Sequence, residues 1–267
     1  MYAPKREQIP DLDEQLGRWI LGGLLLIAIG AGIWYWQKRD SPAETGAEAV
    51  SEEPVATDQP RIRNPIETPA VVDEQAAAAA PAEVRIAALI GAPRFESMFV
   101  PEDFIRRIVA TVDNLPRQKV AARLNPAKPP AGAFATAGGE DERVLAAANY
   151  ERYAPWIELV DSLDADAAVA LYRALYPQFQ SAYEELGIPD GYFNDRVVEV
   201  IDHLLATPEP PETLELVRPN VLYQFADPAL EAQSAGRKLL LRMGPGNAAR
   251  VKMKLRDIRD RIAAQRP

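Results

Sequence analysis

An uninterrupted apolar segment close to the N-terminus constrains this chain more than any other feature. Residues 19–36 read WILGGLLLIAIGAGIWYW, which is eighteen residues without a charge. As a helix rising about 1.5 Å per residue, the segment spans roughly 27 Å, close to the hydrocarbon core of a bilayer. Trp19 begins it and the cluster WYW at 34–36 ends it, where such rings favour the headgroup zone. The sequence therefore predicts one transmembrane helix over 19–36.

The residues in and around this segment bear on its orientation in the membrane and on whether it is a cleavable signal peptide. A cleavable signal peptide is the rival interpretation, with a weak small-x-small site at 28–30, inside the apolar run. The preceding stub, residues 1–18, carries three basic side chains, and two more follow the segment before residue 40. The positive-inside rule then favours a cytoplasmic stub. We expect a bacterial inner-membrane protein with its C-terminal part in the periplasm.

Residues 40–83 have the composition of a disordered linker. They are rich in Pro, Ala, Glu and Thr, lack aromatic residues, and carry ten acidic and two basic side chains. Such a chain buries too little apolar area to offset the entropy lost on ordering. The sequence predicts a tether that lets the following domain reach away from the membrane.

From residue 84 the apolar residues adopt helical spacing, which predicts one compact all-α soluble domain over 84–267. Helices are expected to start at Pro101 and, with Asp164 as N-cap, to run to Gly187. The prolines and glycines of 124–146 indicate a loop with a short hairpin near its end, at 138–139.

Four aromatic residues fall on one face of the helix expected after Asp164. Their spacing of i, i+4, i+7 and i+11 places them in one stripe, which predicts a core-facing surface. An exposed platform for stacking on glycans is the alternative interpretation. The four are Tyr172, Tyr176, Phe179 and Tyr183.

The helix expected over 194–206 has a polar face opposite its apolar one. That face carries Asp195, Glu199, Asp202 and His203, and carboxylates next to an imidazole suit a metal site or acid–base chemistry. A solvated polar face is the simpler interpretation, because the sequence identifies no nucleophile and no further ligand. The chain has one His and no Cys, which excludes thiolate sites and disulfides. We expect no catalytic residue, metal or cofactor.

The C-terminal part is basic although the chain has a net charge of −9. Residues 237–267 carry ten basic and two acidic side chains, and a final helix is expected over 247–264. This basic face can dock on the acidic body of the same domain, bind anionic lipid, or bind an acidic partner or a cell-envelope polymer. Its members are Arg237, Lys238, Arg242, Arg250, Lys252, Lys254, Arg256 and Arg259.

The turn Gly-Pro-Gly at 244–246 resembles the turn of the helix–hairpin–helix DNA-binding motif. In that motif a small residue follows the second glycine by four positions, and this chain has Arg250 there. Pro245 also has no amide to offer a phosphate. Nucleic-acid binding is therefore the least favoured of the alternatives.

Four strings carry a resemblance to a known family: IRRIVATVDNL at 105–115, GIPDGYFNDRVVEVIDHLL at 187–205, VLYQFADPALE at 221–231 and SAGRKLLLRMG at 234–244. Together they resemble a bacterial family catalogued as domain of unknown function 3014, over roughly residues 84–262. The family's layout of membrane helix, Pro/Ala-rich stretch and domain implies a bacterial envelope protein. The resemblance implies no activity and no site residue.

The sequence leaves three functional hypotheses. The leading one is a non-enzymatic envelope protein whose domain binds a protein partner or the cell wall. The second is an envelope enzyme that uses the polar face of the 194–206 helix. The third is binding of nucleic acid or anionic lipid through the basic C-terminal helices.

Overall fold

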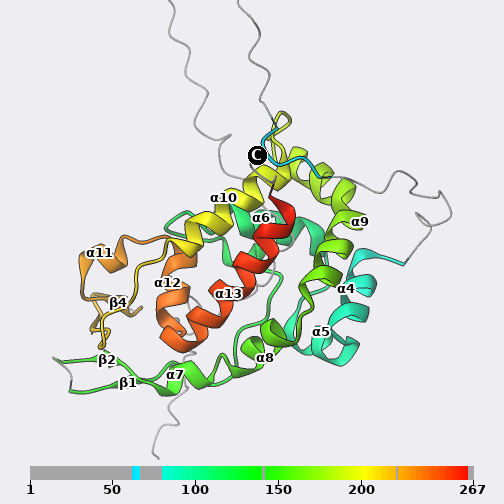
Figure 1. Ribbon diagram of the computed structural model, residues 1–267. Coiled ribbons are helices and arrows are strands. Elements are labelled where there is room, and N and C mark those ends of the chain that lie inside the picture. Colours follow the sequence, from blue (N-terminus) through cyan, green and yellow to red (C-terminus); the bar gives the residue numbers. More distant parts are fainter. Residues whose placement is uncertain (1–61, 67–79, 140–141, 221, 264–267) are drawn as a thin grey trace, which may run out of the picture.

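The computed structural model describes residues 62–66, 80–139, 142–220 and 222–263 (Figure 1). The predicted stub, the predicted transmembrane helix and most of the predicted linker lie outside these residues. Within the described ranges, no helix combines the length and the apolar character needed to cross a membrane.

The described part of the chain is mostly helical, as the all-α prediction requires. Its two short hairpins are antiparallel, and the first lies where the glycines at 138–139 predicted one. The elements are α4 (Ala82–Ile90), α5 (Ala92–Met98), α6 (Phe104–Asn114), η3 (Ala122–Leu124), β1 (Thr136–Ala137), β2 (Val144–Leu145), α7 (Ala148–Glu151), α8 (Ala154–Ser162), α9 (Ala165–Glu184), α10 (Phe193–Leu205), β3 (Leu216–Val217), β4 (Gln224–Phe225), α11 (Pro228–Glu231), α12 (Ala235–Arg242) and α13 (Pro245–Ile262).

Local chemistry explains where several helices begin. The Asp164 side chain accepts a hydrogen bond from the backbone N–H of Ala167 at 2.7 Å, which confirms the predicted N-cap of α9. The expected start at Pro101 is wrong by three residues. Asp103 has a positive φ of 51°, so α6 begins only after it. The first helix of the domain begins at Ala82, two residues before the predicted domain boundary.

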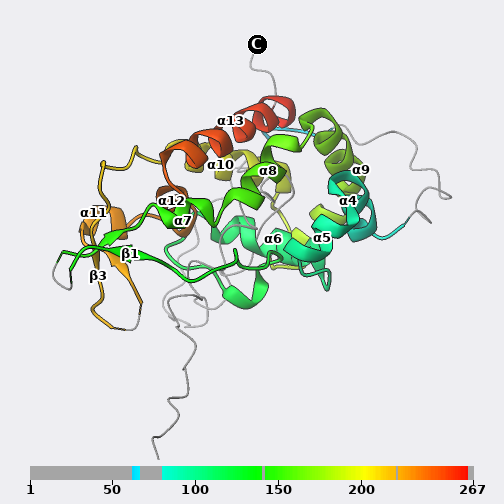
Figure 2. The same cartoon turned by 90° about the horizontal axis from the view of Figure 1, so that it is seen from below.

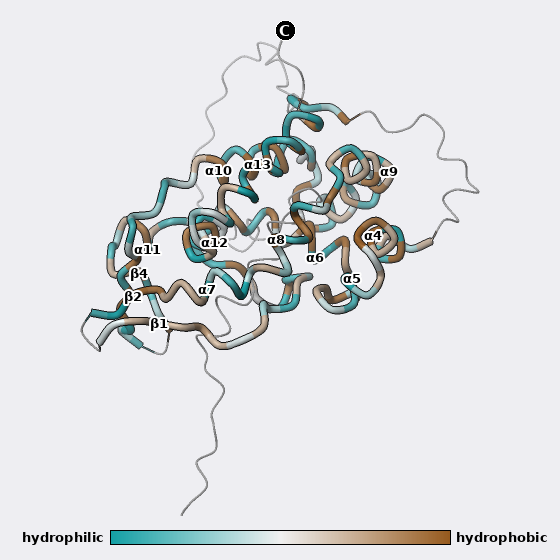
Figure 3. The backbone as a smooth tube through the Cα atoms, turned by 60° about the horizontal axis from the view of Figure 1, so that its bottom comes forward, coloured by the Kyte–Doolittle hydropathy of each residue, from teal (hydrophilic) through white to brown (hydrophobic). Residues whose placement is uncertain are grey.

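The core is built where α9 packs on α6 and where α13 packs on α8, α9 and α10. The aromatic stripe of α9 is buried, with Phe179 fully inaccessible to solvent. The ring of Tyr172 meets that of Tyr176 edge-on and that of Phe179 at a tilt, and Phe179 stacks on Phe193 of α10. The core interpretation is therefore confirmed, and an exposed platform for glycans is wrong. Figure 3 shows the hydrophobic positions recurring along α4, α6 and α9.

The hairpins and α11 form one end of the molecule, and α4 with α5 forms the opposite end (Figure 2). A second, smaller apolar cluster lies at the hairpin end, separate from the main core. The backbone N–H of Leu145 donates to the carbonyl of Leu214 at 2.9 Å, so the two hairpins are joined edge to edge. The cluster comprises Leu145, Leu214, Leu216, Phe225 and Leu241.

Candidate functional site

The polar face of α10 exists as predicted, but its side chains turn to separate partners. Glu199 pairs with Arg196 on its own helix at 2.7 Å, and Asp202 pairs with Arg259 of α13 at 2.6 Å. Asp195 accepts hydrogen bonds from the segment 62–66, far away in the sequence. In the described ranges, no group of three or more His, Asp or Glu side chains is placed to hold a metal ion.

On this face of α10, His203 makes a contact of a kind that is also found in catalytic sites. Its Nε2 lies 2.8 Å from the hydroxyl oxygen of Ser234, the spacing of a nucleophile and its base. The Ser234 side chain is buried, however, and also caps α12 by accepting from the backbone N–H of Arg237 at 3.3 Å. Burial lowers the pKa of His203, and the charges of Arg237 and Arg196 lower it further. The arrangement fits a neutral imidazole that supports a helix cap.

The basic residues of α13 contact the rest of the domain. Arg250 pairs with Asp161 of α8, and Arg259 pairs with Asp202 of α10. The ammonium of Lys252 donates to the carbonyl of Thr207 at 2.7 Å, and that of Lys254 donates to the carbonyl of Leu163. Docking on the acidic body of the same domain, one of the three accounts of this face, is therefore what the contacts show. Arg256 is exposed.

The basic residues of α12 also have partners within the domain. Arg237 donates to the carbonyl of His203 at 3.0 Å, and Lys238 pairs with Glu231 at 2.8 Å. The guanidinium of Arg242 lies over the ring of Phe225, 5.0 Å from its centroid, and it is largely buried. Arg237 therefore ties α12 to α10, whereas Lys238 and Arg242 tie it to the hairpin end of the domain.

The Gly-Pro-Gly turn that resembled a DNA-binding motif is packed against the domain. A Cβ on Gly244 would lie 2.7 Å from the ring of Tyr150. The side-chain amide of Asn247 donates to the carbonyl of Tyr150 at 3.0 Å. The turn thus joins α12 to α13 tightly and uses its glycine for close approach to an aromatic ring.

A basic cavity of about 890 Å³ opens beside α6 and η3. This volume lies in the range of sites that bind small molecules or short peptide segments. The cavity is lined by five cationic side chains, one carboxylate and a few polar and apolar side chains. The lining residues are Asp103, Arg106, Arg107, Asn114, Arg117, Gln118, Lys119, Val120, Ala121, Arg123 and Leu124.

Two of the five cations of the basic cavity are fixed by contacts within the domain. Arg107 donates to the carbonyl of Glu102 at 2.7 Å and to that of Arg123 at 2.6 Å. Arg117 pairs with the buried carboxylate of Asp113. The other three cationic side chains, those of Arg106, Lys119 and Arg123, are exposed at the cavity. The cavity therefore combines a rigid positive wall with exposed cations.

A family model described as protein of unknown function (DUF3014) matches residues 104–259, more than half of the chain. This chain belongs to the DUF3014 family. The matched part of this DUF3014 protein runs from the first residue of α6 into α13, so it contains every residue that lines the basic cavity except Asp103. No curated protein and no solved structure matches the chain.

The basic cavity of this DUF3014 domain was missed in the sequence. A signal was present, because residues 104–124 carry five basic side chains and one acidic one, Asp113. Two of the five lie on α6, and three follow the helix in the loop and in η3. Only the fold of that loop back onto α6 brings them to one cavity, and helical periodicity does not predict such a turn.

Proposed function

We propose that this DUF3014 protein is a non-catalytic, membrane-anchored protein of the bacterial envelope whose helical domain binds an acidic segment of an envelope protein. The anchor is the apolar segment 19–36, and the domain faces the periplasm. The proposal extends the family assignment, which carries no activity, with the chemistry of one cavity.

The basic cavity carries this proposal. The cavity is positively charged, whereas the chain as a whole has a net charge of −9. A negatively charged ligand would therefore bind at the cavity in preference to the rest of the surface. Carboxylates on a partner would pair with Arg106, Lys119 and Arg123, while Arg107 and Arg117 keep the wall rigid. The apolar atoms of Val120 and Leu124 suit a peptide that has apolar side chains between its carboxylates.

The contacts of the polar residues support a non-catalytic role. The carboxylates of α10 pair with Arg196, with Arg259 and with the backbone at 63–64, so each already has a partner within the chain. The imidazole of His203 lies against a buried serine that caps a helix. An enzyme would need such groups to converge on an accessible reacting atom.

The test is binding of a fluorescent peptide of alternating Glu and Leu residues to the full chain in detergent micelles. We expect saturable binding that weakens with salt, because the contacts are charged and exposed. The substitution Arg106→Glu should weaken it roughly tenfold, about 1.4 kcal/mol. The matched control is Arg256→Glu, the same charge change at an exposed position of α13, which should leave binding unchanged.

Two results would contradict the proposal. Equal loss of binding in both variants would show a general charge effect without a site. Retention of purified murein by the full chain, lost in Arg106→Glu, together with no binding of the peptide, would assign the cavity to the cell wall and overturn a protein partner.

A further inference from the structure

A short segment from the predicted linker lies on the domain, and its backbone is held by side chains. The carboxylate of Asp195 accepts from the backbone N–H of Arg63 at 2.9 Å and from that of Asn64 at 2.6 Å. The same carboxylate accepts from the side-chain amide of Asn64 at 2.9 Å. Hydrogen bonds to an ionised acceptor are among the stronger ones in proteins. One carboxylate thus recognises two consecutive amides and the Asn side chain.

Asn194, the neighbour of that carboxylate, binds the segment from a fully buried position. Its side-chain amide donates to the carbonyl of Asn64 at 2.9 Å and to the carbonyl of Ile262, at the end of α13, also at 2.9 Å. Its oxygen accepts from the hydroxyl of Tyr172 at 3.1 Å. Each side-chain donor of Asn194 has one acceptor, and one of these acceptors belongs to the segment. The buried amide is therefore fully satisfied only when the segment is in place.

The backbone of the segment matches the site at every amide from 63 to 66. The first two amides donate to Asp195, and Pro65 has no N–H to satisfy. The backbone N–H of Ile66 donates to the hydroxyl of Tyr192 at 2.7 Å, and its side chain packs against the main core. A proline therefore stands at the one position of the run where the site supplies no acceptor.

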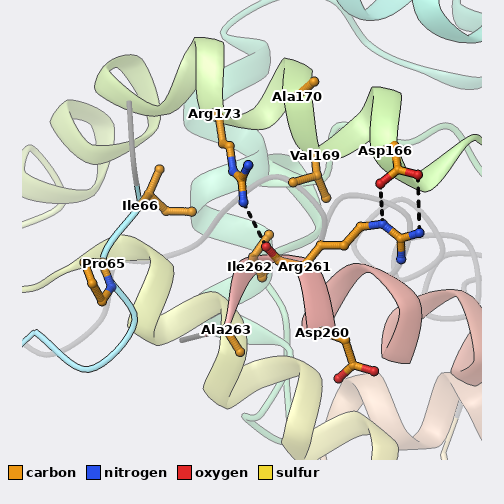
Figure 4. A pocket seen from close by; sticks show the side chains of 10 residues that line it. All are labelled: Pro65, Ile66, Asp166, Val169, Ala170, Arg173, Asp260, Arg261, Ile262 and Ala263. Atoms are coloured by element: carbon orange, nitrogen blue, oxygen red, sulfur yellow. Dashed lines mark hydrogen bonds and ion pairs between the residues drawn. The ribbon is translucent and has the colours of Figure 1, made fainter. Parts of the chain in front are cut away.

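A cavity of about 500 Å³ continues from the segment between α9 and the end of α13 (Figure 4). Pro65 and Ile66 border it on one side, and the side chains of α9 and α13 line the rest. Arg173 crosses it to donate to the carbonyl of Arg261 at 3.0 Å. The segment therefore forms one wall of this cavity, and α9 and the end of α13 form the others.

We propose that the start of α10 and the ends of the neighbouring helices form a binding site for an extended peptide, and that its occupant is the chain's own segment 62–66. Asn194 and Asp195 hydrogen-bond the backbone and the side chain of Asn64, and the hydroxyl of Tyr192 accepts from the backbone N–H of Ile66, directly after the proline. The segment lies outside the residues that the family model matches, whereas Asn194 and Asp195 lie within them.

Docking of the segment shortens the tether. The predicted linker of 40–83 has 44 residues, and only the 22 residues of 40–61 precede the docked segment. At the 3.3–3.6 Å per residue of an extended chain, the maximum span falls from about 150 Å to about 75 Å. This consequence rests on the proposed membrane anchor, whereas the binding site itself does not.

The first test measures hydrogen exchange of peptic peptides that cover residues 62–66, in the full chain. We expect Asp195→Ala to speed exchange of these amides at least tenfold, because it removes three hydrogen bonds to the segment. The matched control is Asp202→Ala, which removes another paired carboxylate from the same helix and should leave exchange of the segment unchanged. Exchange that is already unprotected in the unsubstituted chain would overturn the proposal.

A second test separates a binding site from local packing and does not depend on the stability of α10. The full chain with Asn64→Asp and Ile66→Asp should release its own segment, because a second carboxylate would face Asp195. This variant should then bind a labelled synthetic peptide of residues 59–69, and the unsubstituted chain should bind it at least tenfold more weakly, since the tethered segment competes at high effective concentration. Failure of the variant to bind the 59–69 peptide would overturn the proposal. Binding of the peptide of alternating Glu and Leu residues would still report separately on the basic cavity.

Discussion

His203 is the single imidazole of the chain, and its surroundings oppose its charge. Burial is the largest cause of its lowered pKa, followed by the positive charges of Arg237 and Arg196, and the carboxylate of Glu199 opposes them. In the unfolded chain the imidazole takes up a proton near its usual value of about 6.5. The folded domain resists that proton, so acidification favours the unfolded chain.

The lowered pKa of His203 in the folded domain predicts that stability depends on pH. Well above about pH 6.5 the imidazole is neutral in both states, and His203 contributes nothing to the pH dependence of stability. As the pH falls from there toward the lowered pKa of the folded state, only the unfolded chain is protonated, and the free energy of unfolding decreases. Urea unfolding at about pH 7.5 and pH 5.5 should show a larger loss for the unsubstituted chain than for His203→Gln. Equal losses in the two proteins would contradict a neutral His203.

The polar face shows what sequence reasoning could reach at the level of single residues. Helical spacing correctly placed Asp195, Glu199, Asp202 and His203 on one side of α10, because that placement depends on local geometry. Their partners lie far away along the chain, and no local pattern specifies them. Ser234 follows His203 by 31 residues, and Asn64 precedes Asp195 by 131.

At the scale of elements, the turn between α12 and α13 depends on one glycine. Gly244 has a positive φ of 86°, and a Cβ there would clash with the ring of Tyr150. Gly246, two residues later, lies inside α13 and has nothing within 4 Å of the place where its Cβ would be. The fold therefore requires a glycine at 244 but not at 246, although both belong to the Gly-Pro-Gly string.

Substitution of each glycine by Ala should therefore change the free energy of unfolding in opposite directions. We expect Gly244→Ala to lower the free energy of unfolding by roughly 2–4 kcal/mol, through backbone strain and overpacking against Tyr150. Gly246→Ala should raise it by at most about 0.5–1 kcal/mol, because Ala favours a helix more than Gly does and Gly246 is only the second residue of α13. Urea denaturation of both variants measures this. Similar destabilisation by both substitutions would mean that the turn is not held against Tyr150.

The helices of the core were the most predictable elements. Residues Val251, Leu255, Ile258 and Ile262 recur at helical spacing, and all four are buried along α13. The apolar arc of α10 is buried in the same way. The basic cavity and the groove for 62–66 were not predictable, because each forms where segments without periodicity fold back on these helices.

At the scale of the whole molecule, the location of the domain remains a proposal of the sequence, and it makes a sharp prediction. Alkaline phosphatase fused after Pro267 should be active in bacterial cells, because the enzyme works only after export. A reporter that is fluorescent only in the cytoplasm should be dark at the same position. The matched control is the same phosphatase fusion without residues 19–36, which should be inactive. Fluorescence without phosphatase activity would place the domain in the cytoplasm.

The position of α13 has a consequence for the order in which the fold can be completed. It is the last described helix along the chain, yet it packs on α8, α9, α10 and α12. The growing polypeptide cannot close its core until these residues have left the ribosome. Until then α8 and α10 lack the helix on which each of them packs most. If the domain is exported, as we propose, this late completion of the core would leave it unfolded while it crosses the membrane.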